Sequence, residues 1–349
     1  MNNRICDAIG ENVKRLMRIV VMLVVFSQAV YAQDRFVDKN TITNLGMREG
    51  LRGSYVDALC KDSYGFVWVA TEGGGVARYD GYSFRTIDVQ SNSIKSNFTR
   101  QVVPDLLGRV WVLSDMGVEV VDALSMRSLT GDLFGENAKE QLSVDATLAK
   151  ASSDGAVLWY SSFGNLYAIE NIDARDGAGL EILSVGLDNN ITALGIVDNK
   201  LYVATGSNLS IATIEDGEIK VVPVQLANGP RGNNDITVLF QDQNELWIGT
   251  LWGIYRVNLK NANTNKLYRA VSGDATSLSQ DRITDIVKTA SGRVIVSTLR
   301  GINVYNSYTD TFEQVLSQPS GSGNSEETTV LSSDFINCMM VDGNTIWMG

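Results

Sequence analysis

The 349-residue sequence contains no histidine. This absence excludes every site that depends on an imidazole: a Ser-His-Asp or Cys-His catalytic arrangement, a His-ligated zinc site and a phospho-accepting histidine. We therefore expect no catalytic activity within this segment.

Cysteine and proline are also scarce, with three and four residues. Cys6 lies in a predicted leader, and Cys60 and Cys338 are too few and too far apart to form a disulfide framework. Both lie in apolar, strand-like runs, so we expect two buried free thiols. The low proline content excludes a proline-rich linker, whereas 32 glycines fit a fold with many tight turns.

Positive charge is in deficit: 29 Lys and Arg stand against 40 Asp and Glu, a net charge of −11. An acidic surface repels phosphates, so we expect neither nucleic acid nor anionic lipid as a general partner. The segment Glu72–Gly75 is not a phosphate-binding loop, because no Gly-Lys-Ser/Thr follows it. The alternating oxygen ligands of a calcium loop are also missing. We expect no cofactor and no metal site.

Residues 1–32 have the pattern of a secretory signal peptide. The basic n-region contains Lys14, Arg15 and Arg18, and the apolar h-region spans residues 19–26. Residues 30–32 (VYA) supply the small side chains of a cleavage site. No later stretch approaches the ~20 apolar residues of a membrane span. The sequence thus predicts export to the periplasm, with residues 33–349 as the mature domain. Any membrane contact would come from segments outside this chain.

A short phrase recurs along the chain: an apolar strand, a turn that begins with Asp, then an aromatic anchor followed three residues later by Thr or Ser. The copies are 62–71 (DSYGFVWVAT), 105–114 (DLLGRVWVLS), 154–162 (DGAVLWYSS), 198–205 (DNKLYVAT), 242–250 (DQNELWIGT), 291–298 (SGRVIVST) and 342–349 (DGNTIWMG). Their anchors are Trp68, Trp111, Trp159, Tyr202, Trp247, Ile295 and Trp347.

Successive anchors lie 43 to 52 residues apart. A period of about 40–50 residues made of short strands is typical of a β-propeller with one four-stranded blade per repeat. The first copy predicts strands over 55–61, 66–70, 76–79 and 83–87, with a turn at 62–65 and an Asp-Gly hairpin turn at 80–81. We interpret the recurrent Asp as a turn cap, and the recurrent Thr or Ser as a structural hydrogen bond that closes the next turn.

The ends of the chain bear on how the ring closes. Residues 41–45 resemble an outer strand that would complete the last blade, and the last repeat supplies only two strands before Gly349. The sequence predicts an all-β, seven-bladed propeller of four-stranded antiparallel blades whose last blade is incomplete here. Its third strand is expected beyond Gly349, so we interpret the chain as the N-terminal fragment of a longer protein.

The repeats at 62–71, 75–84 (GVARYDGYSF) and 246–250 (LWIGT), with the lead-in Glu49-Gly-Leu51, resemble the two-component regulator propeller repeat. The resemblance covers roughly residues 36–349 and departs from the pattern at Ile295. It implies the periplasmic sensor region of a dimeric membrane receptor. The output module is most often a histidine kinase, commonly a hybrid with a response regulator, and is a diguanylate cyclase in other members. The implied ligand is an oligosaccharide.

Propellers usually bind ligands on the loops at one end of the central channel. The candidate ligand-binding residues on these loops are Trp252, Arg231, Arg282, Arg300, Glu72 and Asn234. Trp252 is an aromatic outside the anchor position, suited to stacking on a sugar ring, and the arginines suit an acidic sugar. The alternative is that Trp252 packs on the next blade and the arginines pair with nearby acids.

Two other functions stay open at this point. A stand-alone secreted or periplasmic binding propeller would share the fold and the signal peptide, since fold alone does not define function. A carbohydrate-active propeller enzyme would need only two carboxylates at a suitable distance.

Overall fold

The computed structural model describes residues 42–134, 139–173, 180–226, 229–261, 264–317 and 331–349. Residues 42–349 form one compact unit. The predicted signal peptide lies outside the described residues.

Within this part of the chain, the strands form seven antiparallel sheets. Five sheets have four strands in chain order. The first contains β1 (Val56–Lys61), β2 (Val67–Thr71), β3 (Gly75–Tyr79) and β4 (Phe84–Ile87), and the second contains β8 (Leu148–Ala151), β9 (Leu158–Ser162), β10 (Asn165–Glu170) and β11 (Glu181–Gly186). The third contains β12 (Ala193–Val197), β13 (Lys200–Thr205), β14 (Asn208–Glu215) and β15 (Glu218–Val224), the fourth contains β16 (Ile236–Asp242), β17 (Glu245–Thr250), β18 (Gly253–Asn258) and β19 (Lys266–Tyr268), and the fifth contains β20 (Ile283–Lys288), β21 (Val294–Thr298), β22 (Ile302–Asn306) and β23 (Thr311–Val315). One sheet has three strands, β5 (Thr99–Pro104), β6 (Arg109–Ser114) and β7 (Gly117–Asp122), and one has two, β24 (Met339–Asp342) and β25 (Thr345–Met348). Short helical segments are η2 (Met47–Glu49), η3 (Val89–Ser91), α2 (Thr130–Phe134) and α3 (Lys139–Leu142).

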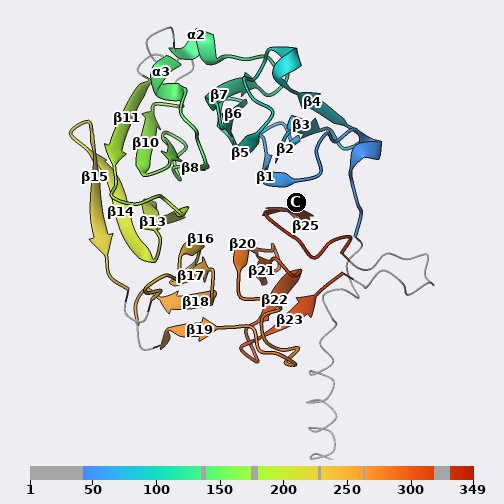
Figure 1. Cartoon of the computed structure of the whole chain (residues 1–349), viewed down its shortest axis with the longest axis vertical. Helices are drawn as coiled ribbons and strands as arrows, with labels where there is room; N and C mark the ends of the chain where they lie inside the picture. Colours follow the sequence, from blue (N-terminus) through green and yellow to red (C-terminus); the bar gives the residue numbers. More distant parts are fainter. Residues whose placement is uncertain (1–41, 135–138, 174–179, 227–228, 262–263, 318–330) are drawn as a thin grey trace, which may run out of the picture. The chain divides into compact units, whose positions relative to one another are not determined.

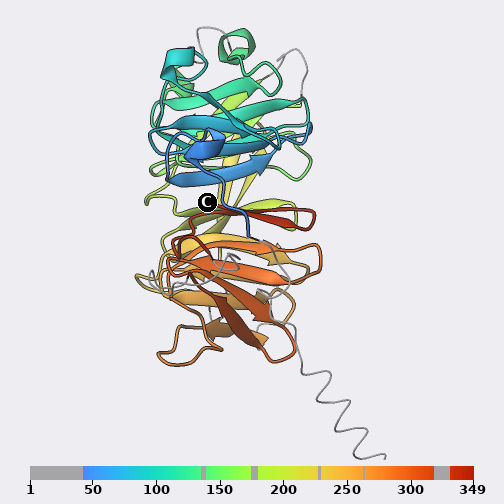
Figure 2. The same ribbon diagram turned by 90° about the vertical axis from the view of Figure 1, so that its right-hand side faces the viewer.

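The sheets are arranged radially, and Figure 2 shows the same ring from its side. Their innermost strands contact one another in the order β1, β5, β8, β12, β16, β20 and β24, and β24 contacts β1. We number the blades 1 to 6 by the innermost strands β1 to β20 and name β24–β25 the hairpin sheet (Figure 1). The predicted all-β propeller of four-stranded antiparallel blades is confirmed. The predicted count of seven blades is not, because the described residues form six blades and a two-stranded sheet.

The outer strand predicted at 41–45 is wrong for the residues described, since 42–45 form no strand. The backbone after them is bonded locally instead. The Glu49 carboxylate accepts the N–H of Gly46 (2.6 Å), and Gly50 closes the turn at φ +98°. This local turn leads the chain into β1 without adding a strand to another sheet.

Blade 2 has three strands where four were predicted. After β7 the chain makes a single bridge between Val121 and Ser128, and Thr130 Oγ1 accepts the N–H of Val120. It then turns into α2, which places Phe134 edge-on against Trp111, with ring centroids 6.0 Å apart. A short helix thus covers the apolar edge that an outer strand covers in most other blades.

Every predicted anchor lies in the second strand of its sheet. Trp68, Trp111, Trp159, Trp247 and Ile295 are buried. The side chains of Tyr202 and Trp347 are half-buried.

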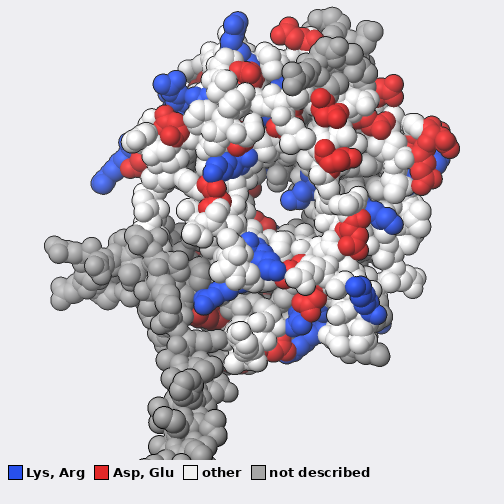
Figure 3. Space-filling view, turned by 180° about the vertical axis from the view of Figure 1, so that it is seen from behind, with Lys and Arg blue, Asp and Glu red and all other residues white. Residues whose placement is uncertain are grey.

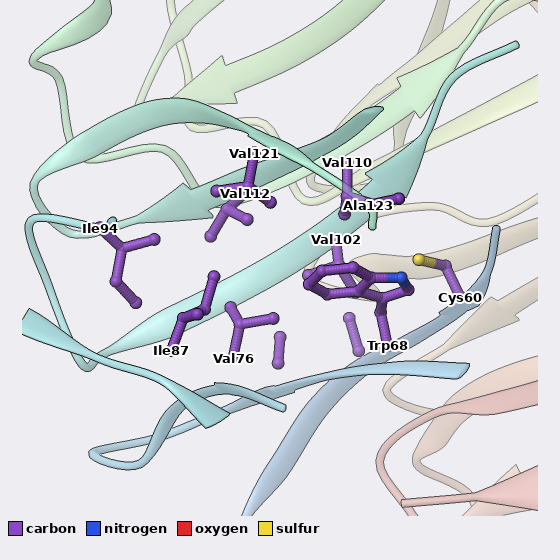
Figure 4. Packing of buried hydrophobic residues seen from close by; sticks show 12 residues of the cluster. Cys60, Trp68, Val76, Ile87, Ile94, Val102, Val110, Val112, Val121 and Ala123 are labelled. Atoms are coloured by element: carbon purple, nitrogen blue, oxygen red, sulfur yellow. The ribbon is translucent and has the colours of Figure 1, made fainter. Parts of the chain in front are cut away.

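Each buried anchor packs between neighbouring sheets. Trp68 shares its cluster with Val102 and Val110 of blade 2, as Figure 4 shows. Because an isolated sheet cannot bury both of its faces, these contacts between blades form the core. Cys60 and Cys338 are buried and free, as predicted.

The recurrent Asp does cap its turn. One oxygen of Asp62 accepts the N–H groups of Tyr64 and Phe66 at 2.9 and 3.0 Å. Asp105 does the same for Leu107 and Arg109.

In the later repeats this Asp also reaches the neighbouring sheet. Asp242 pairs with Lys288 of blade 6, and Asp342 of the hairpin sheet pairs with Lys61 of blade 1 at 2.6 Å. The hairpin sheet therefore contacts blade 1 as blade 5 contacts blade 6.

The recurrent hydroxyl closes the turn between the second and third strands in four blades. Thr71, Ser114, Thr250 and Thr298 each donate to the carbonyl of a glycine at the start of the third strand, at 2.7 to 3.3 Å. These glycines have positive φ angles, so L side chains are disfavoured there.

Candidate functional site

The loops singled out in the sequence lie together on one face of the ring, the loop face. Loops between second and third strands are hydrogen-bonded to the connections between blades. Gly73 N donates to Asn97 O (3.0 Å), Leu251 N to Asp235 O (3.1 Å) and Gly301 N to Asp334 O (2.6 Å). A rigid ring of sheets therefore holds these loops in fixed relative positions.

Trp252 lies on this face with 55% of its surface exposed. Its backbone N–H is held by Asn234 Oδ1 and by Thr250 Oγ1, each at 3.1 Å. The guanidinium of Arg269 lies 5.9 Å from the indole centroid. The indole is thus positioned by its backbone and remains accessible, which argues against the alternative that it is buried on the next blade.

Sequence reasoning missed Arg269. Its Nε and Nη2 both bind Asp281 Oδ2, at 3.0 and 2.8 Å, and this ion pair orients the guanidinium beside the indole. Asp281 lies in the connection to blade 6, whose backbone is bonded to Gly253. No sequence pattern predicted this ion pair. Both residues lie in the connection between β19 and β20, and the path of that connection brings them together.

Arg231, Arg282 and Arg300 are exposed, and none has an ion-pair or hydrogen-bond partner for its guanidinium within the described part of the chain. They lie in three different loops. Arg231 is in the connection after blade 4, Arg282 is in the connection after blade 5, and Arg300 is in the β21–β22 loop. The structure therefore does not gather them into one cluster. It brings Asn234 to Trp252, as the contact above shows.

Glu72 lies in another sector, on blade 1. Burial, and next the negative charge of Glu72, raise the pKa of the Asp57 carboxyl to about 6, while Arg100 opposes the shift. Arg100 is itself paired with Asp145 at 3.1 Å. Glu72 thus belongs to a charged group at the start of the innermost strands and not to the surroundings of Trp252.

A cavity of about 630 Å³ opens beside blade 4. Its walls come from the connection 187–189, the β13–β14 turn, β15 and the segment that carries Arg231. We call it the blade-4 cavity. Its volume falls in the range of small-molecule sites.

The face of the ring shown in Figure 3 is hollowed at its centre and carries both charge signs interspersed. Among the described residues, no group of three or more Cys, Asp or Glu is placed to hold a metal ion. No helix in this part of the chain has the length and apolar character needed to span a bilayer.

Comparison with known proteins identifies the repeat. The sequence model named two component regulator propeller matches residues 50–73, which include β1 and β2. No curated protein matches the chain significantly.

Solved structures resemble the fold. The extracellular domain of BT4673 from B. thetaiotaomicron, named as a hybrid two-component system, has a TM-score of 0.65 at 20% identity, covering 89% of this chain and 38% of that one. That of BT3049 from the same organism has a TM-score of 0.66 at 21% identity, covering 88% and 40%. The designed protein Ika8 has a TM-score of 0.52 at 16% identity, covering 84% and 80%.

These identities show the fold alone. The chain spans about two fifths of the length of the two bacterial domains. The repeat that the residues of the first blade indicated is confirmed at residues 50–73, which match the two component regulator propeller model.

Proposed function

We propose that this chain is part of the periplasmic sensor region of a transmembrane receptor, with a histidine kinase or hybrid two-component module as its output. The repeat at 50–73 supports this proposal, as does the fold shared with extracellular domains named as hybrid two-component systems. Those domains are more than twice as long as this chain.

The hairpin sheet supports the same view. It occupies the position of a seventh blade, contacts both blade 6 and blade 1, and leaves the outer edge of β25 without a neighbouring strand in the described residues. The indole nitrogen of Trp347 is buried without a partner there. We propose that this sheet is the inner half of a seventh blade.

The ligand we propose is an oligosaccharide bound on the loop face, with Trp252 stacking on a sugar ring. The observation that carries this proposal is the accessible indole, held at its backbone by Asn234 and flanked by Arg269. Stacking on such a preorganised aromatic face requires little ordering on binding. Binding would shift the receptor, which we propose to be a homodimer, toward its signalling state.

Iodide quenching of tryptophan fluorescence tests the ligand proposal. The other five tryptophans are less exposed than Trp252, so Trp252 dominates the accessible fraction. A bound sugar from a glycan panel should protect it, and Trp252→Ala should remove both the quenchable component and binding. Tyr308→Ala is the matched control, because this exposed tyrosine lies in the β22–β23 turn, away from the loop face.

If no glycan protects Trp252, the oligosaccharide proposal is wrong. The receptor proposal is tested separately by reading the coding sequence past Gly349. We expect further repeats, an apolar span of ~20 residues and a kinase module. A stop codon soon after Gly349 would instead favour a stand-alone binding propeller.

A further inference from the structure

The blade-4 cavity differs from the surroundings of Trp252 in its chemistry. Its floor is aliphatic and includes the buried side chains of Val203, Leu209 and Ile236. No aromatic side chain of the described residues lines it. The cavity therefore offers apolar surface for aliphatic groups but no ring for a sugar to stack on.

The rim of this cavity is fixed by hydrogen bonds. The Ser207 hydroxyl donates to the carbonyl of Gly232 (2.9 Å), and the N–H of Ile236 donates to the carbonyl of Gly206 (2.9 Å). These two bonds tie the connection between blades 4 and 5 to the β13–β14 turn. Two walls of the cavity are thus joined by loops that belong to the loop face.

Thr205 departs from the role that its equivalents have in four other blades. There the hydroxyl donates across the turn to a glycine carbonyl. In blade 4, Thr205 is paired in the ladder with Asn208 and not with a glycine. Its hydroxyl has no partner among the described residues and lines the cavity. This hydroxyl can therefore donate to or accept from a ligand in the cavity.

Two opposite charges also line the cavity. Asp188 comes from the connection that precedes blade 4, and Arg231 comes from the connection that follows it. They form no ion pair with each other or with another described residue. A ligand that bore only negative charge would meet repulsion from Asp188, whereas a ligand with one charge of each sign would satisfy both groups.

We propose that the blade-4 cavity binds a short peptide with aliphatic side chains. Arg231 holds its terminal carboxylate, Asp188 holds its terminal ammonium group, and the aliphatic floor takes its side chains. An Arg fork suits a carboxylate through two parallel N–H···O bonds. This site is separate from Trp252 and does not depend on the proposed oligosaccharide.

Calorimetric titration with the dipeptide Leu-Leu tests the proposal. Binding should weaken with N-acetyl-Leu-Leu, which lacks the ammonium group, and with Leu-Leu amide, which lacks the carboxylate. Arg231→Ala should reduce the affinity for Leu-Leu by about fivefold or more, equivalent to roughly 1 kcal/mol. In that variant Leu-Leu and its amide should bind equally, because the group that distinguishes them is gone.

Asp188→Asn should likewise abolish the difference in affinity between Leu-Leu and N-acetyl-Leu-Leu. Arg293→Ala is the matched control, since it removes an exposed arginine between β20 and β21, outside the cavity lining, and should leave the affinity unchanged. Trp252→Ala should also leave it unchanged. The proposal is overturned if Leu-Leu does not bind, if N-acetyl-Leu-Leu and Leu-Leu amide both bind as well as Leu-Leu, or if Arg231→Ala does not change the affinity for Leu-Leu.

Discussion

The indole N–H of Trp68 donates to the carboxylate of Asp62, with Nε1 and Oδ2 2.7 Å apart. The other oxygen of the same carboxylate caps the turn that precedes the Trp68 strand. Trp111 and Asp105 repeat this arrangement at 3.0 Å. One side chain thus fixes both the turn and the anchor that fills the space between two blades.

Asp62→Ala should lower the free energy of unfolding by about 2–3 kcal/mol, because it leaves a buried indole N–H and two backbone N–H groups without their acceptor. Urea denaturation measures this loss. Asp154→Ala is the control, since Asp154 is exposed and, among the described residues, accepts hydrogen bonds from Ser152 and Ala156 alone. An equal loss in both variants would contradict the role given to the indole bond.

Arg256 should stabilise the contact between blades 5 and 6. Its guanidinium binds Glu245 (2.7 Å) in its own blade and the Tyr305 hydroxyl (2.5 Å) and Asp310 (3.3 Å) in the next. Arg256→Met should lower the free energy of unfolding by about 1–3 kcal/mol, because the Glu245 carboxylate loses its ion-pair partner. The loss should not be larger, because Glu245 is partly exposed to solvent.

The control for Arg256 is Lys220→Met, which removes an exposed pair with Glu218 and should not change the midpoint of thermal unfolding measurably. If both variants unfold like the parent protein, the Arg256 contacts do not hold the two blades together.

Asp57 should make stability fall as the pH rises. Burial, and then the charge of Glu72, raise its pKa to about 6, above the ~3.9 expected in the unfolded chain. Between these values the folded state binds more protons than the unfolded state, so the free energy of unfolding decreases from pH 4 to pH 6. Asp57→Asn should flatten this slope and stabilise the protein above pH 6. Denaturation at several pH values measures it, and an unchanged slope would show that another group is responsible.

Gly75→Ala and Gly217→Ala should separate backbone strain from steric clash. Both glycines have positive φ angles, +77° and +73°, but an added Cβ at Gly75 would lie 2.3 Å from the carbonyl oxygen of Ile87, whereas at Gly217 it would meet nothing within 4 Å. Gly217→Ala should lower the free energy of unfolding by about 1 kcal/mol, from backbone strain alone. Gly75→Ala should cost about 1–3 kcal/mol more. Equal losses by urea denaturation would show that the clash is relieved by a backbone shift.

The sequence by itself determined the repeat, its strands and its turns. The strand predicted at 55–61 is β1 (Val56–Lys61), and the predicted caps and closing hydroxyls are found in several blades. These features are local, because they follow from alternating apolar residues and turn chemistry within about ten residues of each other. The position of each anchor followed from the same spacing.

Only the tertiary structure decided the contacts between segments that lie apart in the sequence. The replacement of the fourth strand in blade 2 by α2 follows from packing on Trp111. The exposure of Trp252, its contact with Arg269 and the cavity between the connections at Asp188 and Arg231 depend on how neighbouring blades are placed. The spacing of the repeat does not encode these contacts, because they involve loops and connections that lie outside the recurring phrase and are positioned by the ring of sheets.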